Sequence, residues 1–232
     1  MRPLTDDCPK PLLRVQGRPL LRWHVDALAQ GGFRNIVINT AWLGEQIPAH
    51  FGPEPEATDG QPLSIRYSHE GLDFGQALET AGGIARALPL LGEVFWVLAG
   101  DVYAPGFDFS QAAVQRFVAS PMLAHLWLVP NPPHNPRGDF GLSPQGLALN
   151  LPADHPGPRL TYSTIGLYRR ALFEPPWCDI PAGNAQGLAA PLAPLLRRAM
   201  DNQRISAEHY TGAWTDVGTP ERLAQLNSHT TP

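Results

Sequence analysis

The sequence predicts an α/β fold in which helices flank a mixed, mainly parallel sheet. Short apolar or β-branched runs of strand length alternate with longer stretches whose apolar residues recur at helical spacing, and Gly and Pro fall between them. The chain has 232 residues, of which 43% are hydrophobic, and this suits one compact domain with a substantial core. We therefore expect a single domain over residues 1–232.

The first half of the chain alternates between helix and strand patterns, which is the βαβ rhythm of a parallel sheet. Gly31-Gly32 ends the first helical pattern as a C-cap pair does, and the apolar run VFWVL is typical of a strand buried on both faces. The expected elements are a helix over 18–32, a strand over 35–39, an amphipathic stretch over 43–51, a strand over 63–67, a helix over 80–88 and a strand over 94–98.

The second half changes texture near residue 130, where short, polar, Pro-rich pieces begin. Short antiparallel strands are expected there as far as Pro158. Thr219-Pro220-Glu221 opens the last helix with an N-cap, a Pro at the first helical position and an early acid. The other expected elements are a helix over 109–118, strands over 124–129 and 160–168, a helix over 188–201 and a short strand over 214–217.

Composition excludes several classes of protein. No run of about 18 apolar residues and no leader pattern occurs, so we expect a soluble, cytoplasmic protein with no membrane partner. Cys8 and Cys178 form no CxxC or Cys/His cluster, which argues against a zinc site or a disulfide. A formal net charge of −4 argues against nucleic acid as a partner and leaves room for a pocket that binds a small anion.

Two acids stand where a metal ion would be useful. Asp101 directly follows the apolar strand pattern, and ligands of open α/β sheets collect at the carboxyl ends of parallel strands. Asp216 lies between aromatic and apolar neighbours in WTDVGT, just before a helix. Two such carboxylates suit Mg²⁺, which takes its remaining ligands from phosphate and water. For Asp101 alone, a role in capping the turn is an equal alternative.

Two further segments point to phosphate and nucleotide binding. Lys10 lies between prolines in TDDCPKP, which hold the backbone extended and keep the ammonium off a helix face. Glu79 to Gly83, ETAGG, precedes a helix, and its glycines let backbone amides approach a base or ribose. Taken alone, a solvated lysine and an ordinary strand-to-helix turn are the simpler interpretations.

Taken in order, PLT…PKPL, ETAGG, LAGD and WTDVGT resemble the sugar-1-phosphate nucleotidyltransferases over essentially the whole chain. The longer strings INTAWLGEQI, LSIRYSHEG, NPPHNPRGDF and EHYTGAWTDVGTPERL are similar to the bacterial N-acetylmuramate 1-phosphate uridylyltransferases. This resemblance implies a Rossmann-like sheet of the nucleotide-diphospho-sugar transferase type. It also implies a nucleotide-binding half, 1–130, and a sugar-phosphate-binding half, 131–232.

The resemblance also implies roles for particular residues. Asp101 and Asp216 match the two metal-binding acids, and Lys10 matches the lysine that contacts phosphate. Residues of the loop against the nucleotide match Glu79, Thr80 and Gly82. Residues that line the acceptor pocket match Asn131, Gly138, Asp139, Thr164 and Gly166.

The implied reaction is Mg²⁺-dependent transfer of UMP from UTP to N-acetylmuramate 1-phosphate in peptidoglycan recycling, by in-line attack on the α-phosphorus with pyrophosphate leaving. The chain would act as a monomer or a homodimer. A mannose- or glucose-1-phosphate nucleotidyltransferase, using UTP or another NTP, is the alternative within the class. A catalytically impaired protein that binds a sugar nucleotide is the alternative outside it.

The chain departs from this family at its start. Members begin with a short apolar strand and a Gly-rich loop of the kind LAAGxGxRMRPLT, and Met1 to Thr5 match only the tail of that motif. The first strand, the glycines and the motif arginine are thus missing from the chain. Of a misassigned start codon and a true truncation, we expect the former, because the remaining motifs are intact.

Overall fold

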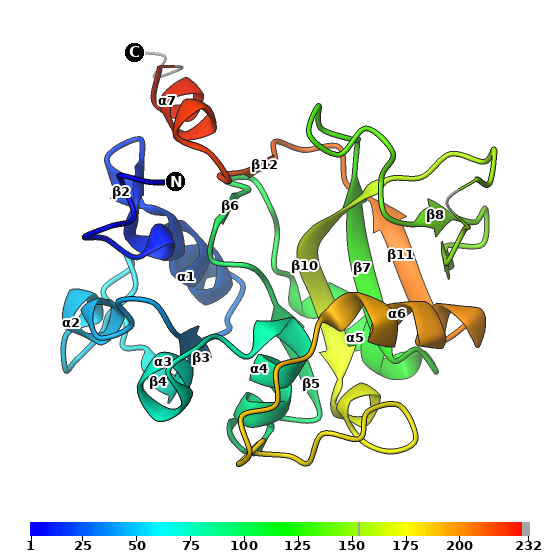
Figure 1. Cartoon of the computed structure of the whole chain (residues 1–232), viewed down its shortest axis with the longest axis horizontal. Coiled ribbons are helices and arrows are strands. Elements are labelled where there is room, and N and C mark those ends of the chain that lie inside the picture. The colour runs from blue at the N-terminus through cyan, green and yellow to red at the C-terminus, as the bar shows by residue number, and fades with distance from the viewer. Residues whose placement is uncertain (153, 229–232) are drawn as a thin grey trace. The chain divides into compact units, whose positions relative to one another are not determined.

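The computed structural model describes residues 1–152 and 154–228 (Figure 1). The chain divides into two compact units, and each is assembled from segments that lie far apart in the sequence. The first unit comprises Met1–Ala77, Gly100–Gln111 and Gly212–Pro232, and the second comprises Leu78–Ala99 and Ala112–Thr211. The expected division near residue 130 falls inside the second unit.

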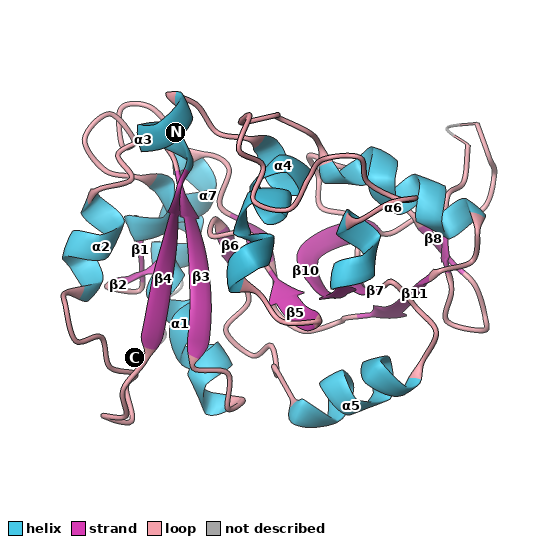
Figure 2. Ribbon diagram, turned by 90° about the horizontal axis from the view of Figure 1, so that it is seen from below, coloured by secondary structure: helices cyan, strands magenta, loops and turns pink. Residues whose placement is uncertain are grey.

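The first unit contains a βαβ arrangement. Its elements are the 3₁₀-helix η1 (Lys10–Leu12), β1 (Arg14–Val15), β2 (Arg18–Pro19), α1 (Leu20–Gln30), β3 (Asn35–Thr40), α2 (Gln46–Phe51), β4 (Ser64–His69), α3 (Glu70–Phe74), β6 (Val102–Tyr103), β12 (Thr215–Asp216) and α7 (Pro220–Ser228). Strands β3 and β4 pair in parallel from Asn35↔Ser64 to Thr40↔His69, and Figure 2 shows them side by side. The expected strand–helix–strand order is thus confirmed.

The apolar faces of helices α1 and α2 pack in one cluster with side chains of the β3–β4 pair. This cluster contains Leu21, Val25, Ala29, Ile38, Ile47, Phe51, Ala57 and Leu63. Side chains four residues apart on α1 share one face of the helix, which is why the helical spacing of the sequence marks this core. The packing fixes α1 beside the strands.

Helix α1 begins two residues later than the sequence pattern indicates. Arg18-Pro19 forms the second strand of the β1–β2 hairpin, which turns at Gln16 and Gly17 with positive φ values of 52° and 77°. Two consecutive residues with positive φ are the geometry of a tight hairpin turn. The helical spacing extends through Arg18 and so hides this hairpin.

The second unit is built on a four-stranded mixed sheet in the order β11-β7-β10-β5. Its elements are α4 (Glu79–Ala87), η2 (Leu88–Leu90), β5 (Val94–Val97), α5 (Gln111–Ala119, whose first residue belongs to the first unit), β7 (Ala124–Val129), β8 (Gly141–Leu142), β9 (Ala148–Leu149), β10 (Thr161–Arg169), η3 (Arg170–Phe173), α6 (Leu192–Asp201) and β11 (Ile205–His209). Within the sheet β7 and β11 run parallel, whereas β10 is antiparallel to both β7 and β5.

Helices cover both faces of this sheet, with α4 and α6 on one side and α5 on the other (Figure 2). The larger core lies under α4 and α6, where Ile84 and Leu196 pack with Leu126, Tyr168 and Phe95 of three strands. The protein is therefore a mixed α/β protein, as the sequence predicts. Within the described residues, no helix combines the length and the apolar character needed to cross a membrane.

Two features of the second unit differ from expectation. The apolar run at Val94–Val97 has the antiparallel strand β10 as its neighbour, although the sequence pattern is typical of a parallel sheet. An apolar run reports burial and not the direction of the neighbouring strand. Strand β11, Ile205–His209, was not expected, because its sequence ISAEH alternates over only five residues.

Candidate functional site

The two candidate metal-binding acids lie on paired strands of the first unit. Asp101 immediately precedes β6 and Asp216 ends β12, and the antiparallel pairing sets Asp216 opposite Val102 (Figure 1). The amide of Val217 donates to the carbonyl of Asp101 at 2.9 Å. The strand pairing therefore places the backbones of two acids from opposite halves of the sequence close together.

Lys10 lies next to Asp101. Its Nζ donates to Asp101 Oδ2 at 2.5 Å, and the two side chains are 29% and 35% exposed, so the pair is open to a ligand. Pro9 precedes η1, and Pro11 packs so closely on Gly100 that a Cβ there would lie 3.2 Å from the proline ring. The tight contact between Pro11 and Gly100 fixes the lysine beside the acid.

Arg222 is a site residue that the sequence reasoning missed. Its Nη1 lies 3.0 Å from Asp216 Oδ2 and donates to the backbone carbonyl of Asp216 at 3.1 Å. Thr219 caps α7 through a hydrogen bond from the Arg222 amide to its Oγ1, which places the arginine in the first turn. Gly218 leaves room for both groups, since a Cβ there would lie 2.9 Å from the arginine and the carboxylate.

His24 is a second residue that was missed. It lies on α1 with 4% exposure, and its Nε2 is 2.8 Å from the carbonyl oxygen of Val102. Burial lowers the pKa of His24 to about 4, against the opposing effects of the Val102 carbonyl and the Asp101 charge. The available signal was a histidine on the apolar face of a helix, which by itself does not reveal its partner.

The site has few protein ligands for a cation. Among residues 1–152 and 154–228, no group of three or more His, Cys, Asp and Glu side chains is arranged to hold a metal ion. Two half-exposed carboxylates, one already paired with an ammonium, do not form a complete cage. They suit Mg²⁺, which keeps water and substrate phosphate oxygens among its ligands.

The three residues expected in the nucleotide loop, Glu79, Thr80 and Gly82, lie in the first turn of α4 in the second unit. Glu79 and Thr80 are exposed, and Glu79 has a positive φ of 56°. The amide of Gly82 is occupied, because it donates to the carbonyl of Ala190 at 3.2 Å. A Cβ on Gly82 would lie 2.3 Å from the carbonyl oxygen of Leu188, so close chain packing explains this glycine.

Three of the residues expected in the acceptor pocket belong to one hydrogen-bonded loop in the second unit. Thr161 Oγ1 donates to Asn131 Oδ1 at 2.9 Å, and the amide of Tyr162 donates to Asp139 Oδ2 at 2.8 Å. Gly138 has a φ of 62°, and a Cβ there would lie 2.7 Å from Asn131 Oδ1. These side chains hold the loop to the start of β10.

The other two residues expected in the acceptor pocket, Thr164 and Gly166, lie at an irregularity in β10. The register shifts between Tyr162 and Gly166, and within this bulge Thr164 has a φ of 65°. Its Oγ1 is buried without a hydrogen-bond partner among the described residues. Gly166 is required by packing, because a Cβ would lie 2.9 Å from the ring of Tyr168. A β-branched residue with positive φ stores strain of about 1–3 kcal/mol, which is characteristic of functional sites.

Comparisons with known proteins agree with these features. A family model described as nucleotidyl transferase matches residues 1–150. Two proteins named N-acetylmuramate alpha-1-phosphate uridylyltransferase are similar to this chain. The one from Neisseria meningitidis serogroup B is 46% identical over 231 residues, covering 98% of this chain and 92% of the relative. The one from Caulobacter vibrioides is 30% identical, covering 95% of this chain and 88% of the relative.

A solved structure supports the fold. The crystal structure of HddC from Yersinia pseudotuberculosis complexed with GMP-PN matches with a TM-score of 0.69 and 15% identity. The match covers 100% of this chain and 94% of that one. At this level of identity the likeness concerns the fold alone.

Proposed function

Because this chain belongs to the nucleotidyl transferase family, we propose that it transfers the uridylyl group of UTP to N-acetylmuramate 1-phosphate and releases pyrophosphate. The observation that carries the proposal is the meeting of Lys10, Asp101 and Asp216 across the β6–β12 pair. The choice of UTP and of a muramate acceptor rests on the two relatives that match nearly the whole chain. We place the reaction in the cytoplasm, as a step of peptidoglycan recycling.

Asp101 and Asp216 would hold a divalent cation, which we propose to be Mg²⁺. The bound ion would neutralise phosphate charge and orient the reacting oxygens. The two carboxylates lie on strands joined by the Val217–Asp101 backbone hydrogen bond, so their positions are set before a substrate arrives. Such preorganisation lowers the barrier because no rearrangement accompanies the reaction.

Lys10 would bind a phosphate of the nucleotide. Its ammonium is paired with Asp101 here, and a triphosphate offers it charge-assisted hydrogen bonds of the same kind. The nucleophile is a phosphate oxygen that is already ionised at neutral pH, so the reaction needs no general base. The role of the chain is to bring two anions together in line and to offset their repulsion.

The acceptor would lie against β10 and the loop of Asn131, Gly138 and Asp139. The strained conformation of Thr164 and its buried hydroxyl support a role for this part of the strand in binding. Glu79 and Thr80, which are exposed at the start of α4, would contribute to the nucleotide side.

The substitution Asp101→Asn tests this proposal. It keeps the size of the side chain and removes one charged ligand, so we expect the turnover number to fall about a hundredfold, on the order of 3 kcal/mol in the barrier. The measurement is magnesium-dependent pyrophosphate release from UTP with N-acetylmuramate 1-phosphate. Asp108→Asn is the matched control, because Asp108 is exposed on the same segment.

The acceptor and the nucleotide are tested in the same assay. Glucose 1-phosphate, mannose 1-phosphate and the other nucleoside triphosphates replace the proposed pair one at a time, and the proposed pair should give the highest kcat/KM. A higher value with another sugar phosphate would overturn the muramate assignment. Binding of a UDP-sugar without pyrophosphate release from any pair would indicate a binding protein.

A further inference from the structure

Helix α1 contacts the strand that follows the metal-binding acid. The Trp23 ring packs edge-on against that of Tyr103 in β6, with their centroids 5.3 Å apart. One residue further along the helix, His24 reaches the backbone of Val102. Two consecutive side chains of α1 thus contact both residues of β6, one through a ring and one through a hydrogen bond.

The hydrogen bond from His24 satisfies a carbonyl of β6 that the pairing with β12 leaves free. Strand β6 is only two residues long, and the ladder bond beside it joins the Val217 amide to the Asp101 carbonyl. In an antiparallel pair the next carbonyl, that of Val102, then points away from β12. A buried carbonyl needs a donor, and His24 Nε2 at 2.8 Å supplies it.

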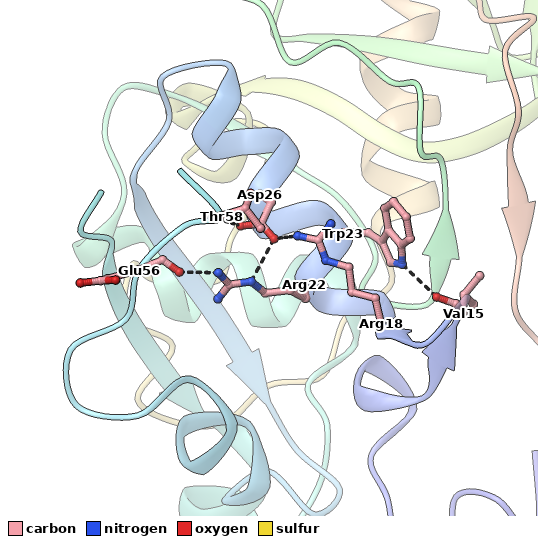
Figure 3. Close-up of polar contacts among 7 residues, drawn as sticks. All are labelled: Val15, Arg18, Arg22, Trp23, Asp26, Glu56 and Thr58. Carbon is pink, nitrogen blue, oxygen red and sulfur yellow. Dashed lines mark hydrogen bonds and ion pairs between the residues drawn. The ribbon is translucent and has the colours of Figure 1, made fainter. Parts of the chain in front are cut away.

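Helix α1 is itself fixed by a charged cluster at its first turns (Figure 3). Asp26, which is 2% exposed, forms ion pairs with Arg18 and Arg22 and accepts a hydrogen bond from the Thr58 amide at 3.0 Å. Arg22 also donates to the carbonyl of Glu56. The cluster ties the helix to β2 and to the segment before β4, so the helix is a fixed support for β6.

We propose that His24 is a positioning residue for the metal site, holding the Val102 carbonyl so that β6, which follows Asp101, keeps its pairing with the strand that carries Asp216. This inference rests on the proposed function, since it assigns His24 a task at the same two acids. His24 contacts neither substrate nor cation. It acts through the backbone of the residue that follows Asp101 and pairs with Asp216.

Three substitutions at His24 test the proposal. His24→Leu removes the donor, His24→Asn carries a donor that is too short to reach Val102, and the amide nitrogen of His24→Gln can take the place of Nε2. We expect the Mg²⁺ concentration for half-maximal rate to rise about tenfold in the first two, and direct Mn²⁺ binding to weaken equally. In His24→Gln both values should return to within about threefold of the wild type. The KM for UTP at saturating Mg²⁺ should change little.

The control is His50→Leu, which removes an exposed histidine from α2, where its ring packs on Phe51. Equal Mg²⁺ dependence in the wild type, His24→Asn and His24→Gln would overturn the proposal. If His24→Leu does not fold, the comparison of Asn with Gln still decides. Failure of the proposed function is distinguishable, because the wild type would then show no magnesium-dependent pyrophosphate release, whatever stands at position 24.

Discussion

His24 links the stability of the first unit to pH. Burial leaves the imidazole neutral in the folded protein, with a pKa lowered from 6.5 to about 4. The imidazole is protonated in the unfolded chain at a pH where it is still neutral in the folded protein. The histidine therefore opposes folding as the pH falls below 6.5, the pKa it has in the unfolded chain. Above that pH the residue is neutral in both states and has no such effect.

We expect the free energy of unfolding to decrease more steeply in the wild type than in His24→Gln as the pH is lowered. The difference should grow from pH 6.5 down to about pH 4 and reach on the order of 3 kcal/mol. Urea titrations of both proteins at about pH 7 and about pH 4.5 measure it, and the shared carboxylates cancel in the comparison. Parallel pH profiles would contradict the buried, neutral state of His24.

Helix α4 depends on a glycine for its contact with the segment before α6. The amides of Ala81 and Gly82 donate to the carbonyl of Ala190, and Asn184 Nδ2 donates to the carbonyl of Gly82 at 3.0 Å. The first turn of a helix has unsatisfied amides, and here a neighbouring segment of the same unit accepts from two of them. Gly82 allows this approach because it has no side chain.

The substitution Gly82→Ala should therefore destabilise the protein although alanine favours helices. The new Cβ would lie 2.3 Å from a backbone oxygen of Leu188, and we expect a loss of about 1–3 kcal/mol from overpacking, which exceeds the helix-propensity gain of about 1 kcal/mol. Gly92→Ala is the control, because its nearest neighbour is 3.9 Å away. Urea unfolding of the two variants should differ, and a stabilised Gly82→Ala would refute the packing argument.

At the scale of the whole molecule, each of the two units is formed from segments that alternate along the chain. The chain passes from one unit to the other after Ala77, Ala99, Gln111 and Thr211. Each unit has a hydrophobic cluster of its own, and the strands β6 and β12 of the first unit are separated in sequence by most of the second. A cut at one point in the sequence does not separate the units.

A fragment of residues 1–130 should therefore fail to fold cooperatively. It would lack β12 with Asp216, and it would lack β10, which lies between β7 and β5 in the sheet. Circular dichroism during a urea titration measures the outcome, with the full chain as control. A cooperative transition in the fragment would show that the nucleotide-binding half expected from the sequence is an independent unit.

Local patterns in the sequence predicted most of the helices and strands and the three polar residues that now lie together. Strand β7 has the expected bounds, and α7 begins at the expected cap, because apolar runs and N-cap residues act over a few neighbours. The prolines and the apolar run marked Lys10 and Asp101 as candidates. Because local signals alone left simpler interpretations open, the family resemblance supplied their expected roles. The β1–β2 hairpin and β11 were missed, since two to five residues carry too little periodicity.

The tertiary structure alone decided which distant groups meet. Nothing local to WTDVGT indicates that Asp216 pairs with Val102 or that His24 supports β6. Such contacts depend on how elements pack across long separations, and a residue type has the same local signature with or without them. The sequence determined which residues are available for the chemistry. The packing of α1, β6, β12 and α7 determined how Asp101, Asp216, Arg222 and His24 are arranged relative to one another.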